Sequence, residues 1–380
     1  MRRTADLPVV NYLSMDPIAS TVGHSQVLAY VERLAKLGVT IDLVTFEESV
    51  DTGLLERLAE IGVVWRPHRF GRHGAAGGLG RVVRASQALR GAELVHARSD
   101  MAAAATMLAG VDRWVWDVRS LWVDQKVATG VVRPGSPPER VMRFVERCSA
   151  QRSSAVVTLT GSAIDELDER YGGAVSSKAT VITTCVDLDR FVASPLPPMP
   201  LRVLISGTVN RYYDVSSMLD LVTELRRRRP VELVVASPCA TDWEVELAGV
   251  EATRISAAPG EMVDLVASCH LGLSVCRDDA GVSLKAAMPT KIGEFLACGR
   301  PVVVNPGLCD AATLLDTHQC GVLYGSSLPG RTKEAVDLIE ERVADARTPA
   351  RCRGLAEKHF DLEEGVERLV ATYELVHRNR

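Results

Sequence analysis

The stretch "GVSLKAAMPTKIGEFLACGRPVVVNPG", residues 281–307, joins an expected helix to an expected buried strand. Ile292 and Phe295 recur at helical spacing, so they belong to one apolar stripe. Pro289 stands where helices tend to begin, and Gly299 stands where they tend to end. The following "PVVV" is a short apolar run typical of a strand inside a parallel sheet. A helix that leads directly into such a strand indicates an α/β fold.

The same alternation extends along most of the chain in both directions. Short apolar runs, each followed by a helical pattern, predict parallel sheets covered by helices on both faces. The expected strands are 7–13, 39–46, 92–97, 113–118 and 154–159 in the first half, and 201–207, 231–237, 270–275 and 320–324, besides "PVVV", in the second.

A proline cluster, "VASPLPPMP" at 192–200, interrupts this alternation and is the best candidate for a linker. We therefore expect an N-terminal Rossmann-like domain at 1–192, a linker at 193–200 and a C-terminal Rossmann-like domain at 201–360. Residues 361–380 are expected to form a helix that packs back toward the first domain. The predicted architecture is two doubly wound parallel-sheet domains facing across a cleft.

Composition narrows the functional class. The chain has 380 residues, is 47% hydrophobic and 24% charged, and carries a net charge of −4, so nothing favours a nucleic-acid partner. Its nine cysteines include no C-x-x-C pair, which favours reduced thiols and a cytoplasmic protein. No apolar run reaches the roughly 18 residues that a membrane span needs, although peripheral contact with a membrane stays open. The abundance of Arg, Ala and Val suggests a bacterial source.

The start of the helix at 289–298 is unexpectedly polar. Free backbone N–H groups and a positive dipole end make a helix start suitable for phosphate. Thr290 adds a hydroxyl, Lys285 and Lys291 add positive charge, and Glu294 is placed to bind a ribose diol. An exposed Lys291–Glu294 ion pair, which contributes only about 0.2–0.5 kcal/mol, explains the residues equally well. The residues alone leave both interpretations open.

A second glycine turn, "LISGTVNRYYD" at 204–214, follows a strand and precedes a helix. Gly207 allows the backbone to approach a ligand, and Arg211 can form a bidentate contact with a diphosphate. A glycine in such a turn is more often structural, so this signal is weak alone.

In the first half, polar residues end two apolar strands. His96 and Arg98 close one strand, and Asp117 and Arg119 close another, so these side chains are expected at the ligand-binding edge of the sheet. A histidine at a strand end is more often structural, and Asp117 and Arg119 can simply hold a loop. No G-x-G-x-x-G, G-x-x-x-x-G-K-[ST] or D-x-D metal motif is present, which argues against a dinucleotide oxidoreductase and a P-loop NTPase.

Taken together, these segments resemble retaining GT-B glycosyltransferases of family 4 over roughly residues 8–325. "MPTKIGEFLACGRPVVVNPG" is similar to the P-T-K-x-G-E-Y-L-A-x-G-x-P-V stretch of one branch of that family. Other segments agree in order with the same branch: "GHSQVLAYVERLAKLG", "VHARSD", "WDVRSLWVDQKV", "VITTCVDLDRF" and "ISGTVNRYYD".

The resemblance implies a metal-independent enzyme that transfers a sugar from a nucleotide diphosphate sugar, UDP or GDP, to an acceptor, with retention. No cofactor is expected. The acceptor nucleophile is expected to be a hydroxyl, in bacterial natural-product or polysaccharide biosynthesis. Base selection is expected near 237–243. The residues implied are His96, Arg211, Lys285 and Lys291 for catalysis, Gly23, His24, Gly207, Thr208, Pro289, Thr290 and Glu294 for the donor, and Arg98, Asp117, Arg119 and Trp122 on the acceptor side.

The chain also departs from the family pattern. Ala287 stands where many members have a second glutamate, His24 replaces a glutamine, and Ser120 replaces a glycine. Two alternatives therefore stay open: a GT-B nucleotide-sugar epimerase, and a sugar-nucleotide binder without catalytic activity.

Overall fold

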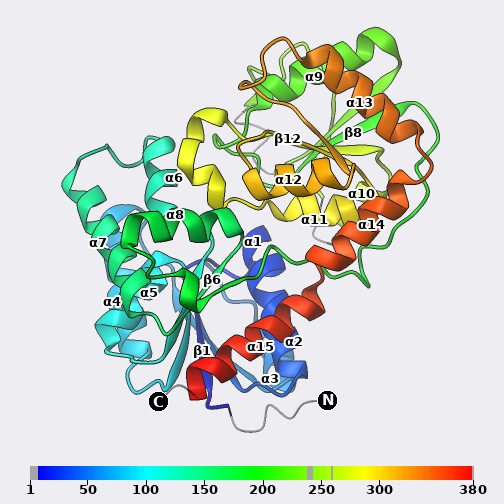
Figure 1. Cartoon of the computed structure of the whole chain (residues 1–380). Helices are drawn as coiled ribbons and strands as arrows, with labels where there is room; N and C mark the ends of the chain where they lie inside the picture. Colours follow the sequence, from blue (N-terminus) through cyan, green and yellow to red (C-terminus); the bar gives the residue numbers. More distant parts are fainter. Residues whose placement is uncertain (1–6, 238–242, 258–259, 379–380) are drawn as a thin grey trace. The chain divides into compact units, whose positions relative to one another are not determined.

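The computed structural model describes residues 7–237, 243–257 and 260–378. The chain divides into two compact units (Figure 1). The first unit comprises Met1–Thr183 together with Leu362–Arg380, and the second is the continuous segment Thr184–Asp361.

The first unit is built on a parallel sheet with the order β3-β2-β1-β4-β5-β6-β7. The chain order therefore reverses between β1 and β4, and in such sheets ligands bind near this reversal, beyond the carboxyl ends of the strands. Strands β1, β2, β4 and β5 are buried along their whole length. The strands are β1 (Val10–Ser14), β2 (Ile41–Glu47), β3 (Val63–Arg69), β4 (Leu94–Arg98), β5 (Trp114–Val118), β6 (Ala155–Thr158) and β7 (Ala179–Val181).

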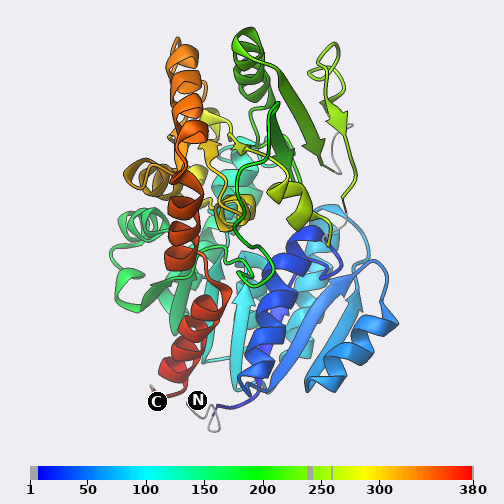
Figure 2. The same cartoon turned by 90° about the vertical axis from the view of Figure 1, so that its right-hand side faces the viewer.

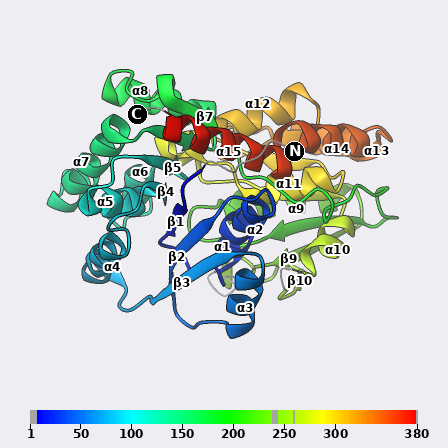
Figure 3. The same cartoon turned by 90° about the horizontal axis from the view of Figure 1, so that it is seen from below.

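Helices cover both faces of this sheet (Figures 1 and 3). The C-terminal helix α15 belongs to this unit, where it packs against α2 and β5 (Figure 2). The helices are α1 (Thr21–Gly23), the π-helical turn η1 (His24–Leu28), α2 (Ala29–Lys36), α3 (Thr52–Glu60), α4 (Gly74–Ala88), α5 (Asp100–Ala109), α6 (Trp122–Ala128), α7 (Pro137–Arg152), α8 (Gly161–Tyr171), η2 (Ser176–Lys178) and α15 (Leu362–Arg378).

The second unit repeats the plan with a parallel sheet in the order β10-β9-β8-β11-β12-β13. Its reversal lies between β8 and β11. The strands are β8 (Leu201–Ser206), β9 (Val231–Ala236), β10 (Thr253–Arg254), β11 (Leu271–Ser274), β12 (Val302–Val304) and β13 (Gly321–Leu323).

Apolar side chains from β8, β9 and β11 pack with those of α9 and α13 into one core cluster of this unit. The helices are α9 (Val215–Arg228), α10 (Met262–Ala267), the 3₁₀ segment η4 (Asp278–Ala286), α11 (Thr290–Ala297), α12 (Cys309–Thr317), α13 (Thr332–Ala344) and α14 (Thr348–His359). In the described ranges of the chain, no helix is both long enough and apolar enough to cross a membrane.

The expected two parallel-sheet Rossmann-like domains are confirmed, but the unit boundary differs from the expected one. The first segment of the first unit ends at Thr183 rather than at 192, and a second segment of the same unit begins at Leu362. The proline-rich segment is not a free linker, because the buried guanidinium of Arg300 donates to the carbonyls of Ser194 and Pro195. These hydrogen bonds fix the segment to the second unit.

Strands β3, β7 and β10, all at sheet edges, were not among the strands expected from the sequence. Pro67 and several polar residues interrupt the apolar pattern of β3, which is tolerated because β3 lies at the edge of its sheet. β10 has only two residues and is also an edge strand.

Candidate functional site

Helix α11 begins at the carboxyl edge of the second sheet. Pro289 caps it with φ −58° and ψ 129°, and Thr290 is its first residue. The helix lies close to β11 because Gly272 has no side chain: a Cβ there would be 2.2 Å from the Phe295 ring. The glycine thus lets α11 pack against the strand next to the reversal of the sheet.

The ammonium of Lys291 is buried within this first turn. The residue is 7% exposed, and its Nζ has no hydrogen-bond partner. Nζ lies 4.1 Å from the centroid of the Tyr213 ring, a cation–π contact. Its Cε is 3.5 Å from the position that a Cβ on Gly207 would occupy. An exposed Lys291–Glu294 ion pair is therefore the wrong interpretation, because Lys291 is not at the surface.

Two buried serines end the strands on either side of the reversal. Leu204 of β8 pairs with Gly272 of β11, so Ser206 and Ser274 lie two residues further along each strand. Residues two apart share a face of a sheet, so both serines point to the face on which α11 packs. Both hydroxyls are buried without a hydrogen-bond partner. Such groups are costly unless something pairs with them.

Burial shifts the pKa of both ionisable groups on α11 toward neutrality. It lowers the pKa of Lys291 from 10.5 to about 8, with Cys276 and Glu294 opposing the shift. It raises the pKa of Glu294 from 4.5 to about 6, with Lys291 and Arg190 opposing it. Both groups are charged between these two values. Perturbed groups of this kind gather at functional sites.

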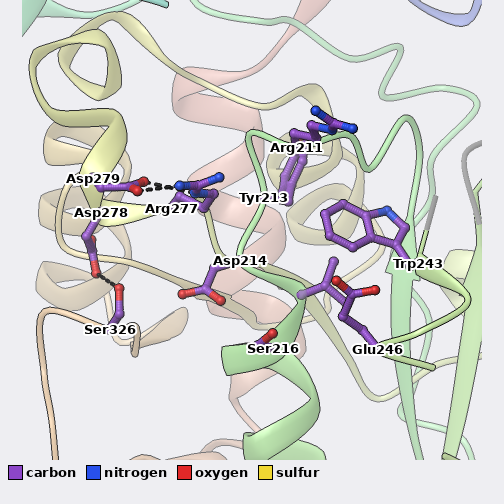
Figure 4. A pocket seen from close by; sticks show the side chains of 11 residues that line it. Arg211, Tyr213, Asp214, Ser216, Trp243, Glu246, Arg277, Asp278, Asp279 and Ser326 are labelled. Atoms are coloured by element: carbon purple, nitrogen blue, oxygen red, sulfur yellow. Dashed lines mark hydrogen bonds and ion pairs between the residues drawn. The ribbon is translucent and has the colours of Figure 1, made fainter. Parts of the chain in front are cut away.

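Arg211 is exposed and lines a cavity of about 580 Å³ at the carboxyl edge of the second sheet (Figure 4). The side chain lies above Tyr213, with Trp243 on one side and the Arg277–Asp279 ion pair on the other. Tyr213 lines the cavity and also contacts Lys291, so one ring connects the Arg211 cavity to the buried ammonium. Trp243 is held there by a hydrogen bond from its indole N–H to the carbonyl of Val209.

The remaining donor-side residues lie in the loops around these groups. Gly207 follows β8 with φ +78°, a conformation that a side chain disfavours, and Thr208 is exposed beside it. Lys285 is half-buried in η4, and Ala287 follows that segment. Of the loop 237–243, residues 238–242 lie outside the described residues. Over the part of the chain that the structure describes, no group of three or more His, Cys, Asp or Glu is arranged to hold a metal ion.

In the first unit, His96 lies within β4 and is 1% exposed, so it is not at the open edge of the sheet where it was expected. Its Nε2 is 3.2 Å from Oδ2 of Asp117, and its Nδ1 is 3.0 Å from the hydroxyl of Tyr373. The ring stacks on Tyr12 with centroids 4.2 Å apart. Burial lowers the pKa of His96, so the ring is neutral. Both nitrogens are occupied by protein groups, which leaves none for a substrate.

Asp117 and Arg119 continue this network toward the end of β5. The pKa of Asp117 is lowered to about 2, because Arg119 and His96 outweigh the effect of burial. Asp117 therefore accepts from His96 Nε2–H and from Arg119, and Arg119 donates to Oε1 of Gln26 in η1 at 2.9 Å. Arg98 ends β4 and forms an ion pair with Asp16 at 2.7 Å. The structure thus places Asp117, Arg119 and Arg98 together.

Three further residues expected at the site lie at the starts or ends of helices in the first unit. Gly23 ends α1, where a Cβ would be 2.0 Å from the carbonyl of Pro17, so backbone packing requires the glycine. His24 starts η1 and is half-buried. Trp122 begins α6, two residues before Asp124, whose carboxylate pairs with Arg143 and Arg170. π-Helical turns such as η1 often occur at functional sites.

Sequence reasoning did not single out Tyr373, Tyr213, Ser206 or Ser274. The two serines carried a usable signal, since each is a polar residue at the end of an apolar strand. Nothing in the sequence indicates that Tyr373, on the last helix, reaches His96.

Known proteins that are similar to this chain have the same two-domain fold. Residues 24–190 match the model of Glycosyltransferase Family 4. No curated protein matches the chain. Among solved structures, the chain is similar to sucrose-phosphate synthase from Thermosynechococcus elongatus, with 15% identity, a TM-score of 0.69, and coverage of 98% of this chain and 100% of that one.

Two further structures cover nearly all of the chain. Anabaena HepE, solved in complex with UDP and glucose, has 16% identity and a TM-score of 0.69, covering 97% of this chain and 99% of that one. A putative UDP-N-acetylglucosamine 2-epimerase from Listeria monocytogenes has 14% identity and a TM-score of 0.63, covering 98% of this chain and 97% of that one. The chain therefore has the GT-B fold, with two Rossmann-like parallel-sheet domains. Structural similarity at such low identity establishes the fold alone, so the activity has to be argued from the residues of the site.

Proposed function

We propose that the protein is a glycosyltransferase that moves a sugar from a nucleotide diphosphate sugar to an acceptor hydroxyl. One observation carries the proposal: the buried Lys291 ammonium has no hydrogen-bond partner and lies in the first turn of α11, and two serine hydroxyls on the sheet face that α11 covers are also unpaired. A helix start already attracts phosphate, and an unpaired cation beside it is costly without an anion. A bound diphosphate would relieve that cost.

The residues of the second unit then take distinct roles. The start of α11, with Thr290, receives the diphosphate, and Lys291 opposes its charge. Arg211 and Lys285 supply further positive charge as the nucleoside diphosphate leaves, which stabilises the transition state. Glu294, one turn into α11, accepts hydrogen bonds from the ribose hydroxyls. Gly207, Thr208 and Pro289 shape the backbone around the phosphates.

The residues of the first unit serve the acceptor side. Arg119 and Trp122 follow the carboxyl end of β5 and are half-buried, whereas Arg98 and Asp117, at 4% and 2% exposure, take positioning roles. His96 acts as a positioning residue that holds Asp117, because its ring is buried and both nitrogens are bonded. We include in the proposal retention at the anomeric carbon, UDP or GDP as the nucleotide, and activity that survives chelation of divalent metals.

A thermal-shift panel of UDP, GDP, dTDP and ADP, alone and as their sugars, tests the donor site. A ligand at 100 times its dissociation constant adds about 2.7 kcal/mol of stability, which is a readily measured shift. We expect one nucleotide to stabilise the wild type and to stabilise Glu294→Ala much less. Glu251→Ala, which removes an exposed glutamate of the same unit, serves as the matched control. A wild type that no nucleotide stabilises would contradict the proposal.

Turnover distinguishes transfer from the alternatives. A transferase releases the nucleoside diphosphate in proportion to acceptor consumed, whereas an epimerase converts the donor sugar without an acceptor. A binder without catalytic activity shows a thermal shift but no product. The Glycosyltransferase Family 4 match over 24–190 favours transfer. The non-catalytic alternative is tested because Ala287 stands where many family members have a second glutamate.

A further inference from the structure

Helices α4, α5 and α7 lie side by side on one flank of the first unit (Figures 1 and 3). Large apolar side chains are exposed on all three. Leu79 on α4 is 67% exposed, Leu108 on α5 is 61% exposed, and Phe144 on α7 is 64% exposed. A single exposed leucine is ordinary, but exposed apolar residues on three neighbouring helices indicate a surface that contacts something.

The spacing on α7 shows that this exposure is organised. Val141, which is 63% exposed, and Phe144 are three residues apart, so they share one stripe of the helix. Arg140 and Arg147 flank them and are also exposed. On α4, Leu79 and Val83 are four residues apart and equally share a stripe, beside the exposed Arg84. We call these residues of α4, α5 and α7 the basic-apolar surface.

Acidic groups are nearly absent from this surface. The sequence from 61 to 92 has no Asp or Glu, and α4 lies within it. The carboxylates on α5 and α7 are Asp100, Glu139 and Glu146. Asp100 and Glu146 are buried, at 3% and 1% exposure, and Glu139 accepts a hydrogen bond from the backbone of Gly135. On the three helices themselves, guanidinium groups therefore lie beside apolar side chains with almost no compensating negative charge; the exposed Glu93 and Asp112 lie in the loops that follow α4 and α5.

We propose that the basic-apolar surface docks on a membrane containing anionic lipids. Arginine guanidiniums bind lipid phosphates, while leucine and phenylalanine side chains at the same level enter the boundary between head groups and acyl chains. The charge complementarity selects this occupant over a second copy of the chain, because a two-fold contact would set arginine against arginine. The inference does not depend on the proposed transferase activity.

Vesicle co-sedimentation of the full chain tests the proposal. We expect the wild type to bind vesicles of phosphatidylcholine mixed with phosphatidylglycerol, and not vesicles of phosphatidylcholine alone. Phe144→Ser should lower the partition coefficient roughly tenfold, and Leu79→Ser should act in the same direction. Arg140→Gln and Arg147→Gln should each lower it about fivefold at low salt and flatten its salt dependence. Leu375→Ser, which changes a leucine that is 51% exposed on α15, is the matched control and should bind like wild type.

Three results would overturn the proposal. The first is a wild type that does not bind anionic vesicles, as expected if the surface binds an acidic protein instead. The second is vesicle binding that Phe144→Ser and Leu79→Ser change no more than Leu375→Ser does. The third is a dimer that Phe144→Ser dissociates, which sedimentation velocity on the protein without vesicles detects. Because the substituted residues are exposed, unchanged unfolding midpoints are expected and confirm that the variants are folded.

Discussion

The hydroxyl of Tyr373 and the Nδ1 of His96 lie 3.0 Å apart, although 277 residues separate them in the sequence. Asp117 is ionised and accepts from Nε2–H, so Nδ1 is the acceptor and the tyrosine O–H is the donor. Helix α15 thus supplies the second of the two hydrogen bonds that hold this buried histidine in one tautomer.

Replacing Tyr373 by Phe should destabilise the protein by about 1–3 kcal/mol, because it leaves the buried Nδ1 without a donor. Urea denaturation measures the loss. Tyr324→Phe is the control: its hydroxyl is 3.3 Å from Thr332 in a part-buried site of the second unit, and a smaller effect is expected. Nitrogen-15 NMR should show the Nε2–H tautomer of His96 in both proteins, because the ionised Asp117 still accepts from Nε2–H, but the Nδ1 resonance should shift in Tyr373→Phe because it has lost its donor. An unchanged Nδ1 resonance would contradict the role assigned to Tyr373.

Lys291→Met should stabilise the unliganded protein and weaken donor binding. The substitution removes a buried charge that has no hydrogen-bond partner, for which we expect a gain of about 1–4 kcal/mol. It also removes the cation assigned to the diphosphate, so donor affinity should fall at least about tenfold. Thermal unfolding and calorimetric titration measure the two effects. Lys333→Met, at an exposed position of α13, should change neither. Loss of stability together with unchanged affinity would rule out the anion site.

Donor affinity should pass through a maximum between about pH 6 and pH 8, the pKa values of Glu294 and Lys291. Below the lower value Glu294 becomes protonated and accepts fewer hydrogen bonds from ribose. Above the higher value Lys291 loses its charge. Titrations with a nucleotide sugar across this range should lose the alkaline limb in Lys291→Met and the acid limb in Glu294→Gln.

The lowered pKa of Lys291 also makes the free energy of unfolding depend on pH. Its pKa in the folded chain, about 8, lies below the ordinary 10.5, so unfolding takes up a proton between these values. Without ligand, this group therefore makes the protein more stable as the pH rises from 8 toward 10.5. The pH dependence of the unfolding midpoint should lose this contribution in Lys291→Met.

Gly272→Ala should cost about 1–3 kcal/mol, because the added Cβ would be 2.2 Å from the Phe295 ring and α11 must shift. Nucleotide binding should weaken along with stability, since the start of α11 moves with the helix. Gly354→Ala on α14, where a Cβ meets nothing within 4 Å, should instead be neutral or stabilising. Equal effects of the two substitutions would show that close packing at Gly272 is unimportant.

Apolar runs and their spacing predicted the strands whose sequences are continuous and buried, including β8, β9, β11 and β12. They did not predict β3, β7 and β10, because edge strands tolerate proline and polar residues and need few residues to pair. The proline cluster predicted a linker, but Arg300, far along the chain, binds that segment to the second unit. Such long-range contacts leave no local pattern.

The candidate site, too, was predictable in part: residue identities could be read from the sequence, but burial could not. The identities of Thr290, Lys291 and Glu294 and their place at a helix start were readable from sequence. The burial of Lys291 was not, because it depends on Tyr213 and on the glycine turn after β8. His96 was recognised, yet its inaccessibility follows from Tyr12 and Tyr373, which come from opposite ends of the chain.

The discontinuity of the first unit has a consequence for synthesis on the ribosome. The second unit, Thr184–Asp361, is continuous, so all of it has been translated before α15 leaves the exit tunnel. Of these two domains, the one that begins to emerge first is therefore completed second, and until then the β4–β5 network lacks the tyrosine that bonds to its histidine. A nascent chain that stalls before residue 362 would display a finished second domain attached to an unfinished first one, which is a natural substrate for chaperones.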